Sequence, residues 1–325
     1  MSSFALPSVP PVARFLIALL LAFTALCARA EPFRFIALGD LPYGPPERAY
    51  APYRQLIGAI NALQPSFSIH IGDIKSGSTR CSNEEFEAQR GHFGMFDGAV
   101  VYTPGDNEWT DCHRANNGAF DPLERLETVR RIFFTTGRSL GRAPLTVENQ
   151  STAMPEFAKF IENQRWQRED VLFVTLHIIG SNNNFEVRDP RAVAEFFERD
   201  RANVAWIREG FAMAGRIKAR AIVFAMQADV FEVKSALDDF PGHSGFRTSI
   251  GETLLPLTAR SGLPVLLIHG DSHQFRIDQP FQFDKKRIPN LTRMIVPGES
   301  DVRAVEVTVD TRAAQPFAMR LVESK

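Results

Sequence analysis

The stretch FRFIALGD (33–40) is an apolar run that ends in Gly-Asp, and the same arrangement returns along the chain. FSIHIGD (67–73) repeats it, AVVYTPGD (99–106) does so with a proline before the glycine, and PVLLIHGD (264–271) follows much later. Each run has the length and the apolar character of a buried strand. Glycine permits a sharp turn, and the aspartate side chain then projects beyond the strand. We therefore expect a sheet with an aspartate at the carboxyl end of each of four strands.

Amphipathic stretches separate the apolar runs, which is the pattern of an α/β protein. Apolar residues at helical spacing predict a helix over 50–63, and Ser82 with Glu85 predicts a capped helix that ends near Phe96. Residues 135–168 have no clear pattern and are expected to be a polar insertion. The remaining predicted elements are strands at 171–179 and 221–226, a helix between them, and short antiparallel strands at 292–298, 304–310 and 317–322.

The N-terminal segment has the order of a secretory signal peptide. Arg14 precedes the apolar run FLIALLLAFTALC (15–27), and ARA (28–30) places small residues where signal peptidase cleaves. We expect cleavage after residue 30, so that residues 31–325 form one mature domain that is secreted or periplasmic. A single membrane anchor is the alternative, but thirteen apolar residues are fewer than the ~18 that a spanning helix needs. No later stretch reaches that length, which excludes a multi-pass membrane protein.

The composition is that of an ordinary globular protein, with 44% hydrophobic and 23% charged residues among 325. Removal of residues 1–30 takes away Arg14 and Arg29 and no acidic residue. It leaves 35 of the 37 basic residues against 38 acidic ones, a net charge of about −3. This balance gives no basic excess for binding nucleic acid or an anionic membrane. The mature chain is therefore not expected to bind nucleic acid or a membrane, and the small molecule that we expect as its partner is inferred from the motifs below.

Two cysteines remain after cleavage, Cys81 and Cys112. An exported chain with two cysteines favours one disulfide. Both residues lie in loops that follow predicted strands, one after GDIKSG (72–77) and the other after GDNEW (105–109). The expected bridge would hold these two loops together.

The carboxyl ends of strands in open α/β sheets are the usual place for ligands. Asp40, Asp73, Asp106, Asp271 and His273 are expected to meet there, since each follows one of the four Gly-Asp strands. Several carboxylates in one site penalise one another's ionisation. Metal cations are the simplest partner that would neutralise them. The sequence thus predicts a metal site at this edge.

The order of these motifs resembles that of the calcineurin-like metallophosphoesterases. GDLP (39–42), GDIKS (72–76), GDNE (105–108), MQA (226–228) and GDSH (270–273) stand where that family has its successive ligand motifs. The resemblance covers essentially the whole mature chain. It implies a four-layer α/β/β/α sandwich with mixed sheets and a two-metal phosphoesterase centre.

The matches and departures define the expected ligands. Asp40, Asp73 and His273 match the family's pattern strictly, and Asp73 would bridge the two metals. Asp106 stands where the family has asparagine, and Asp271 where it has histidine, yet both side chains can bind a cation. A shell with few histidines and many carboxylates favours Mg²⁺, Mn²⁺ or Ca²⁺ over Zn²⁺. Two divalent ions of this kind are the expected cofactors.

Other positions differ more strongly from the family. Pro42 and Gln227 replace ligand histidines, and Asn107 stands where the family's proton-donating histidine would be. Asn107 and His113, in the loop after GDNE, are the candidates for catalytic roles. His70 lies inside a predicted strand and is expected to be a core histidine. Candidates for substrate contact or accessory roles are Tyr43, Lys75, Glu108, His177 and Gln227.

We therefore expect an exported, metal-dependent hydrolase of phosphate mono- or diesters. A relative that binds a metal or a ligand without catalysis is the alternative, since Pro42, Asn107 and Gln227 depart together. The retained aspartates favour the enzyme, because a decayed site would drift to alanine, serine or glycine. A glycosidase with paired carboxylates is a third interpretation, but it leaves His273 unexplained.

Overall fold

Strand β1 (Phe33–Leu38) is buried on both of its faces. In the computed structural model, which describes residues 31–231 and 244–323, the side chains of Phe35 and Ala37 pack in one apolar cluster. Those of Ile36 and Leu38 pack in another. A strand that is covered on both sides has no polar face, which explains why this run is apolar apart from the exposed Arg34. The expected signal peptide, residues 1–30, lies outside the described residues.

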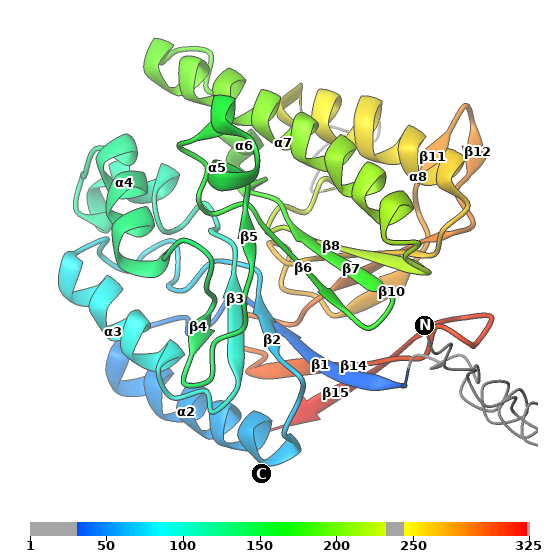
Figure 1. The fold of residues 1–325 in the computed structure, drawn as a ribbon. Helices are drawn as coiled ribbons and strands as arrows, with labels where there is room; N and C mark the ends of the chain where they lie inside the picture. Colours follow the sequence, from blue (N-terminus) through cyan, green and yellow to red (C-terminus); the bar gives the residue numbers. More distant parts are fainter. Residues whose placement is uncertain (1–30, 232–243, 324–325) are drawn as a thin grey trace, which may run out of the picture. The chain divides into compact units, whose positions relative to one another are not determined.

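Two large mixed sheets form the centre of the unit Pro32–Lys325 (Figure 1). Their strands, in the order in which they lie side by side, are β15 (Phe317–Glu323), β14 (Arg303–Val309), β1, β2 (Ser68–His70), β3 (Ala99–Tyr102) and β4 (Leu140–Gly141) in the first sheet, and β10 (Arg276–Asp278), β13 (Leu291–Ile295), β9 (Val265–His269), β8 (Ala221–Ala225), β7 (Val171–Thr175), β6 (Gln164–Arg168) and β5 (Glu148–Asn149) in the second. A separate hairpin joins β11 (Gln282–Phe283) to β12 (Lys286–Arg287).

Helices flank the two sheets. The α-helices are α2 (Pro46–Leu63), α3 (Asn83–Phe93), α4 (Pro122–Phe133), α5 (Gln150–Ala153), α6 (Gly180–Asn183), α7 (Pro190–Arg216) and α8 (Leu255–Ser261). The other helical turns are η1 (Thr110–His113), η2 (Ala115–Asn117), η3 (Pro155–Phe157), η4 (Ser244–Phe246) and the π-helix η5 (Arg247–Leu254). Among the described residues, no helix is long and apolar enough to cross a membrane.

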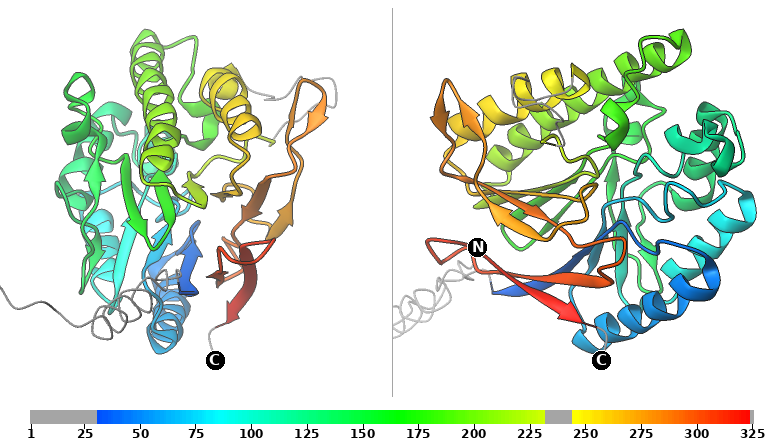
Figure 2. Two further views of the ribbon diagram at one scale, coloured as in Figure 1. Left: turned by 45° about the vertical axis from the view of Figure 1, so that its right-hand side comes forward. Right: turned by 180° about the vertical axis from the view of Figure 1, so that it is seen from behind.

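The layers are α/β/β/α, as the family resemblance implied. Facing side chains of the two sheets, such as Phe35 and Phe173, form the central cluster. On the outer face of the first sheet, Tyr53 of α2 packs with side chains of α3 and α4. On the outer face of the second, Trp206 of α7 and Ile250 of η5 share a third cluster. Figure 2 shows the light-green helix α7 and the yellow helical stretch of residues 247–261 on this side of the second sheet. The prediction of a four-layer sandwich with mixed sheets is confirmed.

Two local predictions were wrong. The strand predicted at 292–298 was expected to be antiparallel, but β13 pairs parallel with β9 and antiparallel with β10. The insertion at 135–168 contains β4, β5 and β6, and Trp166 of β6 packs in the central cluster. Its strands β4 and β5 have two residues each, β4 pairs with the distant β3, and β6 forms a hairpin with the adjacent β7. Local periodicity therefore does not report them.

The parallel strands of both sheets place their carboxyl ends near one another. In the first sheet β1 pairs parallel with β2 and β2 with β3, while in the second β7, β8 and β9 are parallel. The backbone N–H of Asp271, after β9, donates to the Asp40 carboxylate, after β1, at 3.2 Å. This contact joins the carboxyl edges of the two sheets, and the candidate site is built there.

Candidate metal centre

The turns after the strands have an unusual backbone. Asp40, Asp73, Asp271 and His273 have φ values of 50°, 53°, 73° and 59°, in the left-handed region. Aspartate and histidine are among the residues that adopt this conformation more readily than most. Gly72 is needed for a different reason, since a Cβ atom there would lie 2.4 Å from the backbone nitrogen of Gly105. The turns after β2 and β3 pack too closely for any side chain at that position.

Asp40, Asp73 and His273 come together as a possible ligand set. Each offers one ligand atom, and these atoms lie within 4.8 Å of one another. Both carboxylates are buried, whereas the His273 side chain is 25% exposed. His273 Nε2 lies 3.7 Å from Asp40 Oδ1, and its Nδ1 lies 3.5 Å from Glu299 Oε2. Contact with a carboxylate through the other ring nitrogen is a common way of orienting a metal-binding imidazole.

Asp106 and Asp271 lie on the other side of this set and face each other across Gly180. A Cβ atom on Gly180 would lie 2.8 Å from Asp106 Oδ2 and 2.8 Å from Asp271 Oδ1. The Ser181 hydroxyl donates to Asp106 Oδ2 at 2.7 Å. The backbone N–H of Asp229 donates to Asp271 Oδ2 at 3.0 Å. The glycine therefore leaves the space that lets two carboxylates approach each other.

The Asp73 carboxylate is surrounded by donors. Its Oδ2 accepts from the Tyr43 hydroxyl at 2.6 Å, from Asn107 Nδ2 at 2.8 Å and from Gln227 Nε2 at 3.3 Å. Its Oδ1 accepts from the backbone N–H of Asn107 at 3.2 Å. Asn107 Nδ2 also lies 2.6 Å from the Tyr43 hydroxyl oxygen. Tyr43, Asn107 and Gln227 thus contact the central carboxylate directly.

Gln227 follows β8 and is fully buried. Its Oε1 accepts from the backbone N–H of Gly180 at 2.6 Å. Its Nε2 donates to Asp73 Oδ2 and to Asp106 Oδ1, both at 3.3 Å. The side chain therefore presents N–H groups, and not its oxygen, to the carboxylates.

Burial and mutual repulsion shape the titration of the centre. Burial, followed by the charges of Asp106 and Glu108, raises the pKa of Asp40 well above its usual range. The pKa of Asp73 is raised well above its usual range for the same reasons. Burial lowers the pKa of His273, which favours the neutral form that binds metals. A bound cation would stabilise buried carboxylates that repel one another in this way.

Two further charged residues lie behind the carboxylates. Glu108 is fully buried and accepts from the Tyr102 hydroxyl at 2.8 Å and from the Gly105 N–H at 3.1 Å. Lys75 is also fully buried, and its ammonium donates to the Ser76 carbonyl at 3.0 Å. Burial lowers the pKa of Lys75, while the nearby carboxylates, first that of Glu108, oppose this effect. Both residues belong to the surroundings of the centre.

Two other candidate histidines, His113 and His177, lie outside the cluster of carboxylates. His113 is exposed, and its Nδ1 lies 2.6 Å from the Thr110 carbonyl oxygen. His177 is fully buried, and its Nδ1 lies 2.9 Å from Glu162 Oε1. The Arg130 guanidinium contacts the same Glu162 carboxylate. His177 is therefore part of a buried polar cluster between the end of β7, the start of β6 and α4, whereas His113 lies at the surface.

A cavity of about 680 Å³ adjoins the centre. Ser181 lines this cavity, and its hydroxyl contacts both Asp106 and Asp111. Arg114 lines it too and forms an ion pair with Asp111, with Nη1 and Oδ2 2.6 Å apart. The remaining wall includes His113, Thr110, Pro122, Leu123 and Arg191.

Sequence reasoning missed Gly180, Ser181, Asp111 and Arg114. Gly180 and Ser181 follow the strand predicted at 171–179, so the strand–glycine pattern that located the aspartates was present there as well. Asp111 and Arg114 lie just beyond GDNE, but only the fold of η1 brings them beside the cavity.

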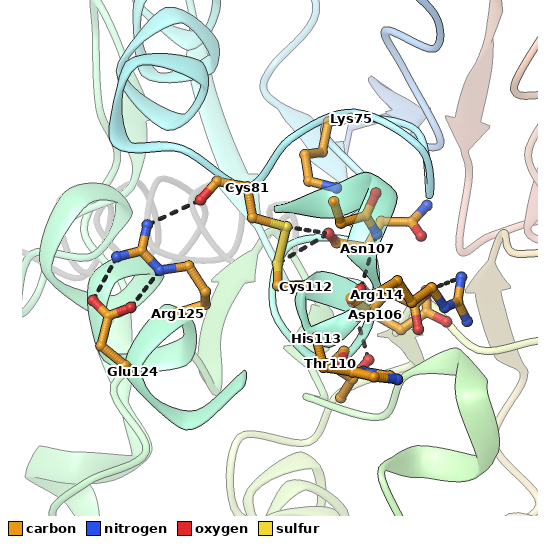
Figure 3. The surroundings of a disulfide bond; sticks show 12 residues. Lys75, Cys81, Asp106, Asn107, Thr110, Cys112, His113, Arg114, Glu124 and Arg125 are labelled. Atoms are coloured by element: carbon orange, nitrogen blue, oxygen red, sulfur yellow. Dashed lines mark hydrogen bonds and ion pairs between the residues drawn. A yellow bond between two sulfur atoms is a disulfide. The ribbon is translucent and has the colours of Figure 1, made fainter. Parts of the chain in front are cut away.

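The expected disulfide is present. Cys81 and Cys112 are bonded, with their Cα atoms 5.7 Å apart. The two sulfur atoms lie 3.6 and 3.7 Å from the carbonyl oxygen of Asn107, and Figure 3 shows Asn107 and Lys75 beside the bridge. The bridge thus connects the loop after β2 to the loop that carries Asn107, and this prediction is confirmed.

Comparisons with known proteins find similarity at the level of structure. No protein-family model matches the sequence, and no curated protein matches it either. A dimetal phosphatase from Danio rerio has a similar structure, with a TM-score of 0.55 and 11% identity. The similarity covers 91% of this chain and 100% of that one.

Two further solved structures are similar over most of this chain. PhoD has a TM-score of 0.52 at 9% identity, and 92% of this chain and 71% of PhoD are covered. The purple acid phosphatase PPD1 from seeds of yellow lupin (Lupinus luteus) has a TM-score of 0.50 at 11% identity. The similarity covers 91% of this chain and 54% of the lupin protein. The chain therefore has the calcineurin-like fold of dimetal and purple acid phosphatases.

Proposed function

We propose that this protein is a metal-dependent hydrolase of phosphate mono- or diesters. One observation carries the proposal: Asp40, Asp73 and His273 offer ligand atoms within 4.8 Å of one another at the carboxyl edge of a sheet. Asp106 and Asp271 lie beside them. The similar structures named as phosphatases support the same reaction class.

The residues present fit a divalent cation between Asp40, Asp73 and His273. A ligand set of two carboxylates and one neutral imidazole favours Mg²⁺ or Mn²⁺, with Ca²⁺ as a further choice, over Zn²⁺. Burial and neighbouring carboxylates raise the pKa values of both carboxyl groups, so their ionised forms are unfavourable without a neutralising partner. A bound cation supplies Lewis acidity at a phosphoryl oxygen.

The chain's own side chains would position the ester. Asn107 Nδ2 holds the Asp73 carboxylate and the Tyr43 hydroxyl in fixed places. His113 lines the adjoining cavity, and its contact with the Thr110 carbonyl favours a proton on Nδ1, so Nε2 is the ring atom that would be available to a leaving group. The cavity beside Ser181 has room for the organic part of a small phosphate ester.

A relative that binds a metal without catalysis is the second candidate. Asn107 supports it, because this amide has no proton to give to a leaving alkoxide at neutral pH, and it is engaged with Asp73. His113 is the other candidate for a proton donor, and it lies outside the carboxylate cluster.

Phosphatase assays on the purified chain with Mn²⁺ and a panel of phosphomonoesters and phosphodiesters test the proposal. Asp73→Asn should lower kcat/KM at least about 100-fold, or ~2.7 kcal/mol, because Asp73 lies at the middle of the centre. Asp97→Asn is the matched control, since Asp97 is exposed and pairs with Arg142. Cation binding without hydrolysis of any ester would favour the non-catalytic relative, and absence of cation binding would refute both.

Export is part of the proposal. The order of residues 14–30 supports a signal peptide, and a disulfide is typical of oxidising compartments outside the cytosol. We expect the mature protein to begin at Glu31. N-terminal sequencing of protein from the secreted or periplasmic fraction checks this, and an intact N-terminus would contradict it.

A further inference from the structure

We infer that the centre holds one divalent cation, between Asp40, Asp73 and His273, and that the Gln227 amide takes the place of a second. This inference rests on the proposed metal-dependent function. It departs from the two-metal arrangement that the sequence resemblance implies. It also makes Gln227 the residue that determines how many cations the centre binds.

The first argument concerns the lone pairs of Asp73. A carboxylate has about four lone-pair directions, two on each oxygen. The Tyr43 hydroxyl, Asn107 Nδ2 and Gln227 Nε2 all donate to Oδ2. That oxygen has no direction left for a cation. From the described residues, the Oδ1 atom accepts the Asn107 backbone N–H, which leaves it a direction for one cation. Asp73 in this arrangement cannot bridge two.

The second argument concerns the orientation of Gln227. Its Oε1 accepts from the Gly180 N–H at 2.6 Å, and its Nε2 faces two carboxylates. The reversed amide would set an oxygen against Asp73 and Asp106 and an NH₂ group against the Gly180 N–H. Both contacts would be repulsive. The hydrogen bonds therefore fix the amide with Oε1 towards Gly180 and Nε2 towards the two carboxylates. An amide N–H donates hydrogen bonds and does not bind a cation.

The third argument concerns charge. The Ser181 hydroxyl contacts Asp106 Oδ2 at 2.7 Å and Asp111 Oδ1 at 3.1 Å, so these two carboxylates are neighbours. The Arg114 guanidinium pairs with Asp111, with Nη1 and Oδ2 2.6 Å apart. This guanidinium therefore offsets part of the negative charge beside Asp106. It would also repel a second divalent ion bound there.

Metal binding to the purified, folded chain tests the inference directly. The chain is equilibrated with Mn²⁺, the bound metal is counted by elemental analysis, and the electron paramagnetic resonance spectrum is recorded. We expect one Mn²⁺ per wild-type chain and the spectrum of an isolated ion. Two ions ~3.5–4 Å apart would instead be magnetically coupled.

Substitutions at Gln227 should change the count. Gln227→Glu keeps the shape, removes the N–H donors and adds a carboxylate, so we expect two coupled Mn²⁺ ions per chain. Gln227→His is the second variant, with a neutral ligand instead of a charged one. Gln164→Glu is the matched control, because Gln164 is equally buried but lies in β6. It should bind one ion, and circular dichroism checks that all three variants are folded.

The outcomes separate the two proposals. Two coupled ions on the wild-type chain would overturn the one-cation inference and leave the proposed function intact. No bound Mn²⁺ on the wild-type chain would overturn the metal centre itself. One ion on the wild type and on both folded Gln227 variants would refute the role of Gln227.

Discussion

Gly180 shows at the scale of one residue how closely the centre is packed. The Cβ atom of an alanine there would lie 2.8 Å from oxygens of Asp106 and Asp271, well inside contact distance. The two carboxylates would have to move apart, so Gly180→Ala should lower kcat/KM at least about tenfold, or ~1.4 kcal/mol. Steady-state kinetics on the most rapidly hydrolysed ester measures this.

Gly215→Ala is the control for this substitution. A Cβ atom on Gly215, in α7, meets nothing within 4 Å. Alanine is the better helix former by ~1 kcal/mol, so this variant should be as active as the wild type and slightly more stable. Full activity in Gly180→Ala would show that the space between the carboxylates is not required.

His70 should make the protein sensitive to acid. Its Nε2 lies 3.2 Å from the Leu41 carbonyl oxygen, and its Nδ1 accepts from the Gly72 N–H at 3.3 Å, so the neutral ring satisfies both neighbours. Burial lowers the pKa of His70 to about 3. In the unfolded chain a histidine takes up its proton near pH 6.5, so the unfolded state binds more protons between these values. The free energy of unfolding should therefore fall as the pH decreases below ~6.5, by ~1.4 kcal/mol per pH unit from this residue.

Urea unfolding of His70→Gln between pH 4 and pH 7.5 checks this contribution. The variant should lose that part of the pH dependence, although its stability at neutral pH is expected to be lower. The exposed His113, replaced by glutamine, should keep the wild-type dependence. An unchanged slope in His70→Gln would mean that other groups cause the acid sensitivity.

At the scale of elements, the disulfide is the connection between two loops of the site. Cys81 and Cys112 are 31 positions apart, and a closed loop of this length stabilises the folded state by ~3–4 kcal/mol in the chain-entropy model. The double variant Cys81→Ser, Cys112→Ser should lose about that much free energy of unfolding in urea. It should also lower activity, since both sulfurs contact the Asn107 carbonyl.

Free-thiol titration of the denatured, unreduced wild-type protein accompanies this experiment. We expect no reactive thiol from these two cysteines. Equal stability of the double variant and the wild type would show that the surrounding contacts, such as that of Arg125 with the Cys81 carbonyl, hold the loops without the bridge.

At the scale of the whole molecule, the centre joins the two sheets. Asp40 and Asp73 follow strands of the first sheet, and His273 follows β9 of the second, so a cation bound among them should stabilise the complete fold. At a Mn²⁺ concentration of ~100 times Kd the gain is ~2.7 kcal/mol. Thermal unfolding with Mn²⁺ and with a chelator measures it, and His273→Ala should reduce the shift. A melting temperature that Mn²⁺ leaves unchanged would argue against a cation in this position.

The sequence by itself determined the features that depend on local order. Apolar runs ended by Gly-Asp predicted β1, β2, β3 and β9. Consecutive apolar residues indicate burial on both faces of a strand, and the glycine that follows them permits a sharp turn. The two remaining cysteines predicted the bridge. The resemblance to calcineurin-like metallophosphoesterases predicted the four layers, and the fold of the similar phosphatases agrees with it.

Only the tertiary structure decided the features that depend on distant contacts. The parallel direction of β13 follows from pairing with β9, and β4, within 135–168, follows from pairing with β3. The amide of Gln227 is oriented by Gly180, and the donors to Asp73 come from three separate loops. Hydrogen bonds and close approaches of this kind depend on the packing of two sheets against each other. Residue type and spacing along the chain therefore locate the carboxylates but do not reveal which of their lone pairs stay open to a cation.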